Sequence, residues 1–286
     1  MPALRDLVAE ELSLPADPRV RAMAAAVAAK YGKSARAVLF YGSCLRQKQL
    51  DGLMLDFYLI VSSYREAYGR GWMAAANRLV PPNVFPFQDG NLAAKYAVLS
   101  EKDFWKLNGP ETRNVSVWAR FAQPSRLVWA ADDAARDRAI DSVARAVPTL
   151  LGAVLPTAAK SSDPLDLWRH AFALTYSAEL RAERKARGGS VVDFEPDRYR
   201  RFTQAGLAVA VPNRASWARR RIEGKMLSVV RLAKASATFA GGADYIAWKI
   251  NRHSGTNIVL KPWQRRWPLL AAISLLPRLL RSGAVR

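Results

Sequence analysis

The stretch that decides the fold runs from Ala35 to Ser62, and it contains two apolar segments, ARAVLFY (35–41) and LMLDFYLIVS (53–62). Each is short and almost wholly apolar, which is typical of a strand buried in a sheet. Gly42-Ser43 ends the first segment, and Asp56 alone interrupts the second. The residues between Ser43 and Asp56 suffice for a short helix and a return strand, so we expect Asp56 on the strand adjacent to the Gly-Ser turn.

Beyond this stretch the pattern predicts two more strands, followed by a mostly helical region. The expected strands are Leu92–Ser100, which carries a lone Lys95, and Ser125–Ala130. A Pro- and Asn-rich loop is expected over Pro81–Asn91. The expected helices are Arg19–Tyr31, Tyr64–Leu79, Asp132–Leu155, Pro164–Lys185, Asp197–Ala205 and Ala215–Phe239. We therefore predict an α/β fold class with three parts: an N-terminal domain (1–131), a helical domain (132–255) and a C-terminal tail (256–286).

The charge of the chain points to a polyanionic partner. Forty-four Lys and Arg against twenty-four Asp and Glu give a net charge of +20. Residues 214–286 hold fifteen Lys or Arg and two acids, Glu223 and Asp244, so a quarter of the chain carries +13 of this charge. Nucleic acid, a nucleoside triphosphate and an anionic lipid surface are the candidate partners.

Several classes of protein are disfavoured by the same composition. The lone Cys44 leaves no internal disulfide and no cysteine-based zinc site. The charged N-terminus does not resemble a signal peptide, and no stretch reaches the roughly 20 apolar residues that cross a bilayer. We therefore expect a cytoplasmic protein, or one that is peripheral on the inner face of the membrane. No Walker loop, dinucleotide fingerprint or nucleophile elbow is found.

A strand, a Gly-Ser turn and a second strand that carries an acid form the beginning of a polymerase-β-like nucleotidyltransferase fold. Glycine lets a phosphate approach the backbone, and the Ser43 hydroxyl and following amides can hold triphosphate oxygens. Asp56 would then bind the Mg²⁺ that bridges those oxygens. Many members of this fold carry Asp-x-Asp on the second strand, whereas here the second position is Tyr58. A buried structural role for Asp56 is the alternative.

Six segments form a succession of motifs along the chain: Tyr41-Gly42-Ser43, Leu55-Asp56-Phe57-Tyr58, Lys95-Tyr96-Ala97-Val98, Ala119-Arg120-Phe121-Ala122-Gln123-Pro124, Leu174-Thr175-Tyr176-Ser177-Ala178-Glu179-Leu180-Arg181 and Phe239-Ala240-Gly241-Gly242. Their succession resembles the mitochondrial translocator assembly and maintenance family of CDP-diacylglycerol synthases, which has bacterial relatives. The order and spacing agree from Val38 to Lys249. Ala97 and Ala178 stand where the family has glycine, and Glu179 stands where it has aspartate.

The resemblance implies a phosphatidate cytidylyltransferase, which makes CDP-diacylglycerol and pyrophosphate from CTP and phosphatidic acid. It implies Mg²⁺ as cofactor, an anionic membrane surface as partner, and no nucleic acid. By the same resemblance Asp56 is a catalytic residue and the metal ligand. The other residues that the resemblance assigns are Lys95 as catalytic, Tyr41, Gly42, Ser43 and Arg120 as nucleotide-binding, and Tyr176, Glu179 and Arg181 as lipid-phosphate or supporting residues. A second metal ligand is left open among Asp51, Glu66, Asp89 and Glu179.

Two C-terminal segments are amphipathic. On a helical wheel of Arg220–Ala237, one half carries basic residues and the opposite half carries apolar ones. The basic half holds Arg220, Arg221, Lys225, Arg231 and Lys234, and the apolar half holds Ile222, Met226, Val229, Val230 and Ala233. This helix either lies on anionic lipid or covers a core with its apolar half. Trp267–Pro277 is apolar between arginines, too short to span a bilayer, and suited to its interface or to the protein's own core.

Two other functions compete with this interpretation. The first is a nucleotidyltransferase of the same fold that acts on a different acceptor, such as a protein, a sugar phosphate or tRNA. The second is a non-catalytic basic protein that binds nucleic acid, although no recognised nucleic-acid motif is found. An assay of nucleotide transfer with different acceptors distinguishes the three.

Overall fold

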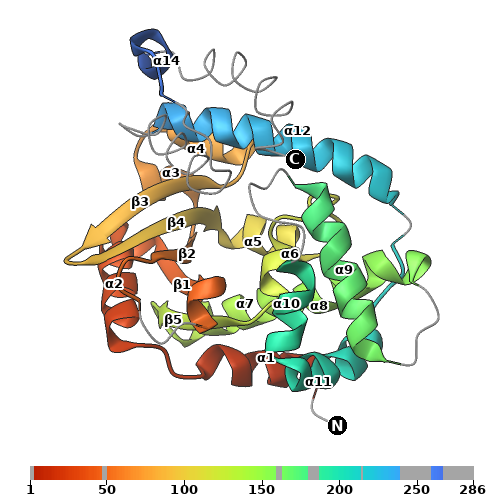
Figure 1. The fold of residues 1–286 in the computed structure, drawn as a ribbon. Coiled ribbons are helices and arrows are strands. Elements are labelled where there is room, and N and C mark those ends of the chain that lie inside the picture. The colour runs from red at the N-terminus through yellow and green to blue at the C-terminus, as the bar shows by residue number, and fades with distance from the viewer. Residues whose placement is uncertain are drawn as a thin grey trace.

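A five-stranded mixed sheet organises the N-terminal half of the molecule (Figure 1). The computed structural model describes residues 3–46, 50–158, 163–179, 187–213, 215–238 and 259–266. The spatial order of the strands is β3-β4-β2-β1-β5, with β2 and β4 parallel and the other neighbouring pairs antiparallel. The strands are β1 (Ala35–Tyr41), β2 (Met54–Val61), β3 (Asn83–Asp89), β4 (Leu92–Ser100) and β5 (Ser125–Ala130).

The described helices surround this sheet and continue beyond it. Those that precede or interleave with the strands are α1 (Leu4–Ser13), α2 (Pro18–Ala29), α3 (Tyr64–Tyr68), α4 (Gly71–Leu79), α5 (Glu101–Asn108) and α6 (Trp118–Phe121). Those that follow are α7 (Asp133–Ala144), α8 (Ala146–Val154), α9 (Pro164–Ala178), α10 (Arg187–Phe194), α11 (Pro196–Leu207), α12 (Trp217–Thr238) and α14 (Pro262–Arg266). Short 3₁₀ turns are η1 (Gly32–Ser34), η2 (Ser43–Arg46) and η3 (Leu155–Thr157).

Both faces of the sheet are covered, because successive side chains of each strand point to opposite sides. Leu39 and Ile60 face a core that α1, α5, α7, α8, α9 and α11 share. Phe40 and Phe57 face a second core built with α2, α3 and α4. The first core runs from the sheet into the helical region. The predicted domain division at residue 131 falls between β5 and α7, and it stays a prediction.

The α/β class and the four expected strands are confirmed, but the loop expected over Pro81–Asn91 is wrong. Residues Asn83–Asp89 form β3, which pairs with β4 and lies at the edge of the sheet. An edge strand tolerates proline, because an N–H that faces away from the neighbouring strand is not needed for pairing. Pro86 therefore sits within β3, opposite Lys95.

The expected helices are found with changed bounds. Tyr64–Leu79 divides into α3 and α4 at Gly69, whose φ of +60° ends the first helix. Asp132–Leu155 divides into α7 and α8. The continuous stretch Asp133–Thr157 is long and apolar enough to cross a membrane, with a mean hydropathy of 1.3, but 67% of its most apolar window is buried inside the protein. That burial is what a core helix shows.

Helix α12 connects the two halves of the molecule (Figure 1). It packs against α9 and also reaches β3. Gly224 makes the contact with α9 possible, since a Cβ at this position would collide with the carbonyl oxygen of Ala178, the last residue of α9. The helix therefore holds the end of α9 beside the sheet.

Candidate active site

A glycine turn at the end of β1 forms the floor of the candidate site. Gly42 has a φ of +93°, a backbone conformation that favours glycine. A Cβ at Gly42 would lie 3.3 Å from the Asp56 Oδ2 atom. Ser43 is exposed and begins η2, a 3₁₀ turn of four residues. The helix expected after Ser43 is therefore only one turn long, and the turn's amides and hydroxyl remain as potential anion donors.

Replacement of Gly42 with Ala is expected to lower the free energy of unfolding by about 1–3 kcal/mol, the usual cost of holding a side chain in a disfavoured backbone region. The new methyl group would also press on the Asp56 carboxylate. Urea denaturation measures the change, and Gly52→Ala is the matched control. Gly52 also has a positive φ of +75°, but a Cβ there meets no atom within 4 Å. If the two variants had equal nucleotidyl-transfer activity, the contact between Gly42 and Asp56 would have no role in that activity.

Asp56 and Lys95 meet because of strand register. Asp56 lies opposite Tyr41 on one side and opposite Lys95 on the other. The Lys95 Nζ atom is 3.0 Å from the Asp56 Oδ1 atom, and the two side chains are 30% and 19% exposed. The ion pair is thus open to solvent on one side. Asp56 Oδ1 contacts the lysine, and Asp56 Oδ2 is the carboxylate oxygen nearest the glycine turn.

Two tyrosines line the site beside this pair. The rings of Tyr41 and Tyr58 are 5.2 Å apart, and Tyr58 also packs against Phe121 at 5.1 Å. Burial raises the pKa of both hydroxyl groups, and the nearby charge of Asp56 raises them further. Both tyrosines are therefore neutral near pH 7. The Tyr58 position, which carries an acid in many polymerase-β-like proteins, here forms part of an aromatic wall.

Arg120 and Glu179 form a second ion pair next to the tyrosines. Arg120 lies on α6 and Glu179 follows the last residue of α9, and their side chains approach to 3.2 Å. Glu179 is 8% exposed and Arg120 28%. Burial acts to lower the pKa of Arg120, but Glu179, Tyr58 and Tyr41 together outweigh it, so the net pKa is raised. Arg120 also donates to the Ser116 carbonyl oxygen. The guanidinium is thus charged and fixed in place.

Arg231 and Lys234, which the helical wheel places on the basic half of α12, extend the cationic cluster. Arg231 donates to the Pro81 carbonyl oxygen at 2.7 Å and to Ser116 Oγ at 2.8 Å. Lys234 Nζ donates to the Pro82 carbonyl oxygen at 2.9 Å. Burial lowers the pKa of Arg231, and it lowers that of Lys234 to about 8. The Nη2 atom of Arg231 is buried and has no hydrogen-bond partner within the described part of the chain.

The remaining residues named from the sequence are not all brought together. Tyr176 is partly buried against the core, one turn before Glu179 on α9. Arg181 and the Phe239–Gly242 segment lie outside the described residues, as does Trp267–Pro277. The contacts given above therefore join Tyr41, Gly42, Asp56, Lys95, Arg120 and Glu179, together with the unforeseen Ser116, Arg231 and Lys234.

The four candidates for a second acidic metal ligand have other surroundings in the structure, and the choice among them stays open. Within the described ranges no three His, Cys, Asp or Glu residues gather where they would hold a metal ion. Glu179 is paired with Arg120, Asp51 with Arg19 at 3.4 Å, and Glu66 accepts a hydrogen bond from Ser62 at 2.6 Å. Asp89 is exposed at the end of β3. One carboxylate cannot cage a free ion, but Mg²⁺ at nucleotide sites is often held by one or two carboxylates plus the substrate phosphates. Asp56 fits an ion that arrives on a triphosphate.

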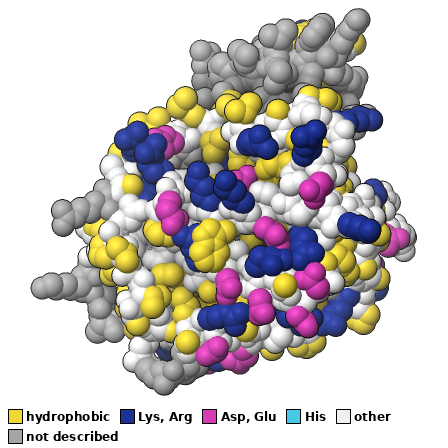
Figure 2. All heavy atoms as spheres, turned by 180° about the vertical axis from the view of Figure 1, so that it is seen from behind, with side chains coloured by type: hydrophobic (Ala, Val, Ile, Leu, Met, Phe, Trp, Pro, Cys, Tyr) yellow, Lys and Arg dark blue, Asp and Glu magenta, His cyan; other side chains and the backbone are white. Residues whose placement is uncertain are grey.

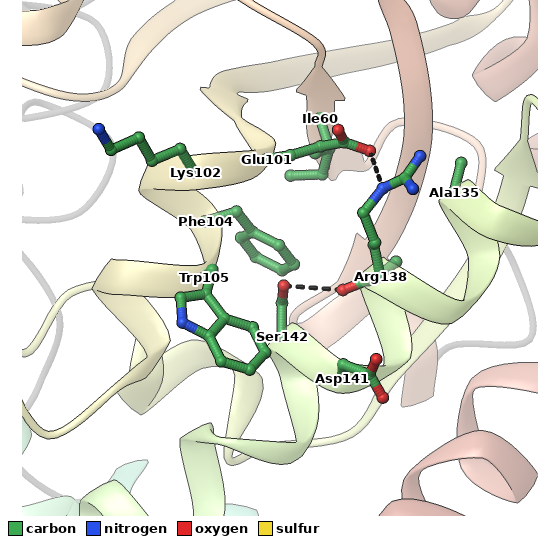
Figure 3. A pocket seen from close by; sticks show the side chains of 10 residues that line it. Ile60, Glu101, Lys102, Phe104, Trp105, Ala135, Arg138, Asp141 and Ser142 are labelled. Atoms are coloured by element: carbon green, nitrogen blue, oxygen red, sulfur yellow. Dashed lines mark hydrogen bonds and ion pairs between the residues drawn. The ribbon is translucent and has the colours of Figure 1, made fainter.

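A separate cavity of about 270 Å³ lies between α5 and α7 (Figure 3). Ile60 lines it, four residues along β2 from Asp56, or about 13 Å. The polar groups at this cavity already bind one another: Arg138 pairs with Glu101 at 2.8 Å, and the Ser142 hydroxyl donates to the Arg138 carbonyl oxygen. Figure 2 shows that basic and acidic side chains are interspersed on the face seen there. Lys102 also lines the cavity, but its side chain points away from the other labelled residues in Figure 3, so the Asp56 region is the better candidate for a phosphate.

Comparison with known proteins adds a distant structural likeness. No family model matches the sequence, and no curated protein matches it. Among solved structures the chain resembles a nucleotidyltransferase-like protein from Exiguobacterium sibiricum 255-15, with 11% identity, a TM-score of 0.28 and 92% of each chain covered. A likeness this distant does not indicate a function, so the evidence for a function comes from the chemistry of the side chains around Asp56.

Proposed function

We propose that the protein is a polymerase-β-like nucleotidyltransferase that transfers a cytidylyl group from CTP to phosphatidic acid. The main support for the proposal is the close approach of Asp56 to the glycine turn. The Asp56 Oδ2 atom is 3.3 Å from the position that a Cβ atom would take at Gly42. Lys95 contacts Asp56, while the charges of Arg120 and Arg231 act on the neighbouring Tyr41 and Tyr58. A close backbone approach, one carboxylate and several fixed cations are the features that a triphosphate site needs.

In the proposed reaction a phosphate oxygen of phosphatidic acid attacks the α-phosphorus of CTP. The bond between the α-phosphorus and the α–β bridging oxygen breaks, and pyrophosphate leaves with that electron pair. The protein's task is mainly to position the reactants and to balance charge. The Gly42 and Ser43 turn would hold the β- and γ-phosphates. Lys95 would exchange its contact with Asp56 for a phosphate oxygen, which leaves the Asp56 carboxylate available.

Magnesium is the cofactor that this proposal requires, and Asp56 would hold it through the carboxylate. The ion would supply positive charge to the triphosphate oxygens as negative charge develops on the leaving pyrophosphate. Arg120 is prevented from moving by Glu179 and Ser116, so it would offer a rigid donor to the same phosphates. Arg231 Nη2, which has a buried and unfilled donor position, would suit the phosphate of the acceptor.

The proposal is tested with the purified protein, phosphatidic acid in mixed micelles, Mg²⁺ and each of the four ribonucleoside triphosphates in turn. Pyrophosphate release and the lipid product are both measured. CTP is expected to give CDP-diacylglycerol, while the other nucleotides react at least about tenfold more slowly. Transfer to a sugar phosphate, tRNA or a protein instead of the lipid would refute the acceptor and keep the transferase.

A role in binding nucleotide without transfer is the second candidate, and the Asp56–Lys95 ion pair favours it. If Lys95 keeps its contact with Asp56 when nucleotide is bound, the carboxylate is not available to a metal. This candidate predicts saturable CTP binding with no pyrophosphate release for any acceptor. Calorimetry with CTP, with and without Mg²⁺, is the measurement. Strengthening of CTP binding by Mg²⁺, lost in Asp56→Asn, would contradict it.

A further inference from the structure

Helix α12 presents its apolar residues outward, which is the reverse of a helix that covers a core. Ile222, Met226 and Val230 are spaced four residues apart and are 63%, 65% and 46% exposed. At this spacing they form one stripe along the helix. The inward face instead carries Arg220, which is 1% exposed and donates to the Arg113 carbonyl oxygen at 2.9 Å. The expectation that the apolar half covers a core is therefore wrong for these three residues.

Exposed basic side chains border the stripe on one side. Arg221 and Lys225 are exposed, and Arg219 is 62% exposed while it pairs with Glu223. An apolar stripe with exposed cations along one side matches a bilayer that carries negative headgroups, because the stripe enters the acyl boundary while the cations meet the headgroups.

The same helix reaches the candidate active site from its other face. Arg231 follows Val230 directly, yet it points inward to Ser116 and the Pro81 carbonyl. Lys234 lies one turn further on and contacts the Pro82 carbonyl. A surface seated on Ile222, Met226 and Val230 would thus lie one helix diameter, about 10 Å, from the cations of the site.

We propose that the outward stripe of α12, formed by Ile222, Met226 and Val230, is the docking surface of this protein for an anionic lipid bilayer. Its opposite face then presents Arg231 and Lys234 to a lipid phosphate drawn from that bilayer. The inference deepens the proposed function and rests on it, because a lipid substrate is the reason why the protein would bind a membrane.

The test uses the full chain and vesicles of phosphatidylcholine with phosphatidylglycerol, without nucleotide, so that a failure of the transferase proposal does not affect it. The triple variant Ile222→Ser, Met226→Ser, Val230→Ser is expected to bind these vesicles about 100-fold more weakly in sedimentation. The control variant is Leu207→Ser, Val209→Ser, Val211→Ser, which changes three other exposed apolar residues, at 38%, 57% and 70% exposure. It is expected to bind as the unchanged chain does.

A charge variant and single variants complete the design. Arg221→Ser with Lys225→Ser is expected to weaken binding to the anionic vesicles about tenfold and to leave the weak binding to pure phosphatidylcholine unchanged. Ile222→Ser and Met226→Ser singly are each expected to cost about fivefold, which keeps the test valid if the triple variant does not fold. Unchanged binding of the folded stripe variants, no binding by the unchanged chain, or conversion of a dimer to a monomer by the triple variant would each overturn the proposal.

Discussion

The substitution Asp56→Asn is expected to lower the rate of nucleotidyl transfer by about 10³-fold or more while the protein remains folded. The change keeps the shape of the side chain and removes its negative charge. Asp56 has the carboxylate that the structure places against the glycine turn, with Oδ2 3.3 Å from the position of a Gly42 Cβ. Stability is expected to change little, because the pair with Lys95 is partly open to solvent. Pyrophosphate release and thermal unfolding measure the two effects.

The matched control is Asp89→Asn, which removes the same charge at an exposed position at the end of β3. It is expected to keep the full rate. Lys95→Met provides a second comparison, since it leaves Asp56 intact and removes its present partner. That variant should bind CTP more weakly without losing its dependence on Mg²⁺. A normal rate in Asp56→Asn would exclude Asp56 from the chemistry and favour a purely structural ion pair.

The strands that carry the candidate site are predictable from the sequence because they are buried on both faces. β1, β2 and β4 are continuous apolar segments, and an isolated Asp56 or Lys95 within such a segment stands out. β3 is not predictable in the same way. Its Pro86 and Asn83 are typical of loops, and only its position at the sheet edge allows them.

The contacts that the site residues make are less predictable from the sequence than the site residues themselves. The contact between Asp56 and Lys95 depends on the parallel register of β2 and β4, which is set across the whole sheet and not by local spacing. Arg120 and Glu179 are 59 positions apart in the sequence. Their meeting joins α6 to the end of α9, which local sequence spacing does not indicate.

The orientation of α12 illustrates a limit of helical-wheel reasoning. The wheel separates basic from apolar residues correctly, but it does not say which half faces the protein. Burial of arginine is favourable only where carbonyl and hydroxyl groups receive its donors. Those groups come from Thr112, Arg113, Ser116 and Pro81, which lie in loops with no distinctive sequence pattern. The inward arginines therefore emerge only from tertiary structure.

Replacement of Glu179 with Gln is expected to lower the free energy of unfolding by about 3 kcal/mol, the usual cost of leaving one charge of a buried pair without its partner. Glu179 is 8% exposed, and Arg120 would remain charged in its place beside Tyr41 and Tyr58. Urea denaturation measures this loss. Asp163→Asn is the control, because Asp163 makes a long 4.0 Å contact with Arg169 at the surface and is 43% exposed. Asp163→Asn is expected to change the free energy of unfolding by no more than about 1 kcal/mol, since Asn can also act as the N-cap of α9.

The double variant Arg120→Leu, Glu179→Leu separates the structural role of the pair from a functional role of Arg120. Apolar side chains in both positions avoid an unpaired buried charge, so much of the stability is expected to return. Transfer is not expected to return, since the fixed guanidinium proposed for the triphosphate is gone. The Mg²⁺ concentration that the Glu179→Gln variant needs for transfer decides whether Glu179 also binds the metal. An unchanged Mg²⁺ requirement is expected for a counter-ion to Arg120, whereas a requirement raised about tenfold or more would make Glu179 the second metal ligand and contradict the assignment made from its ion pair.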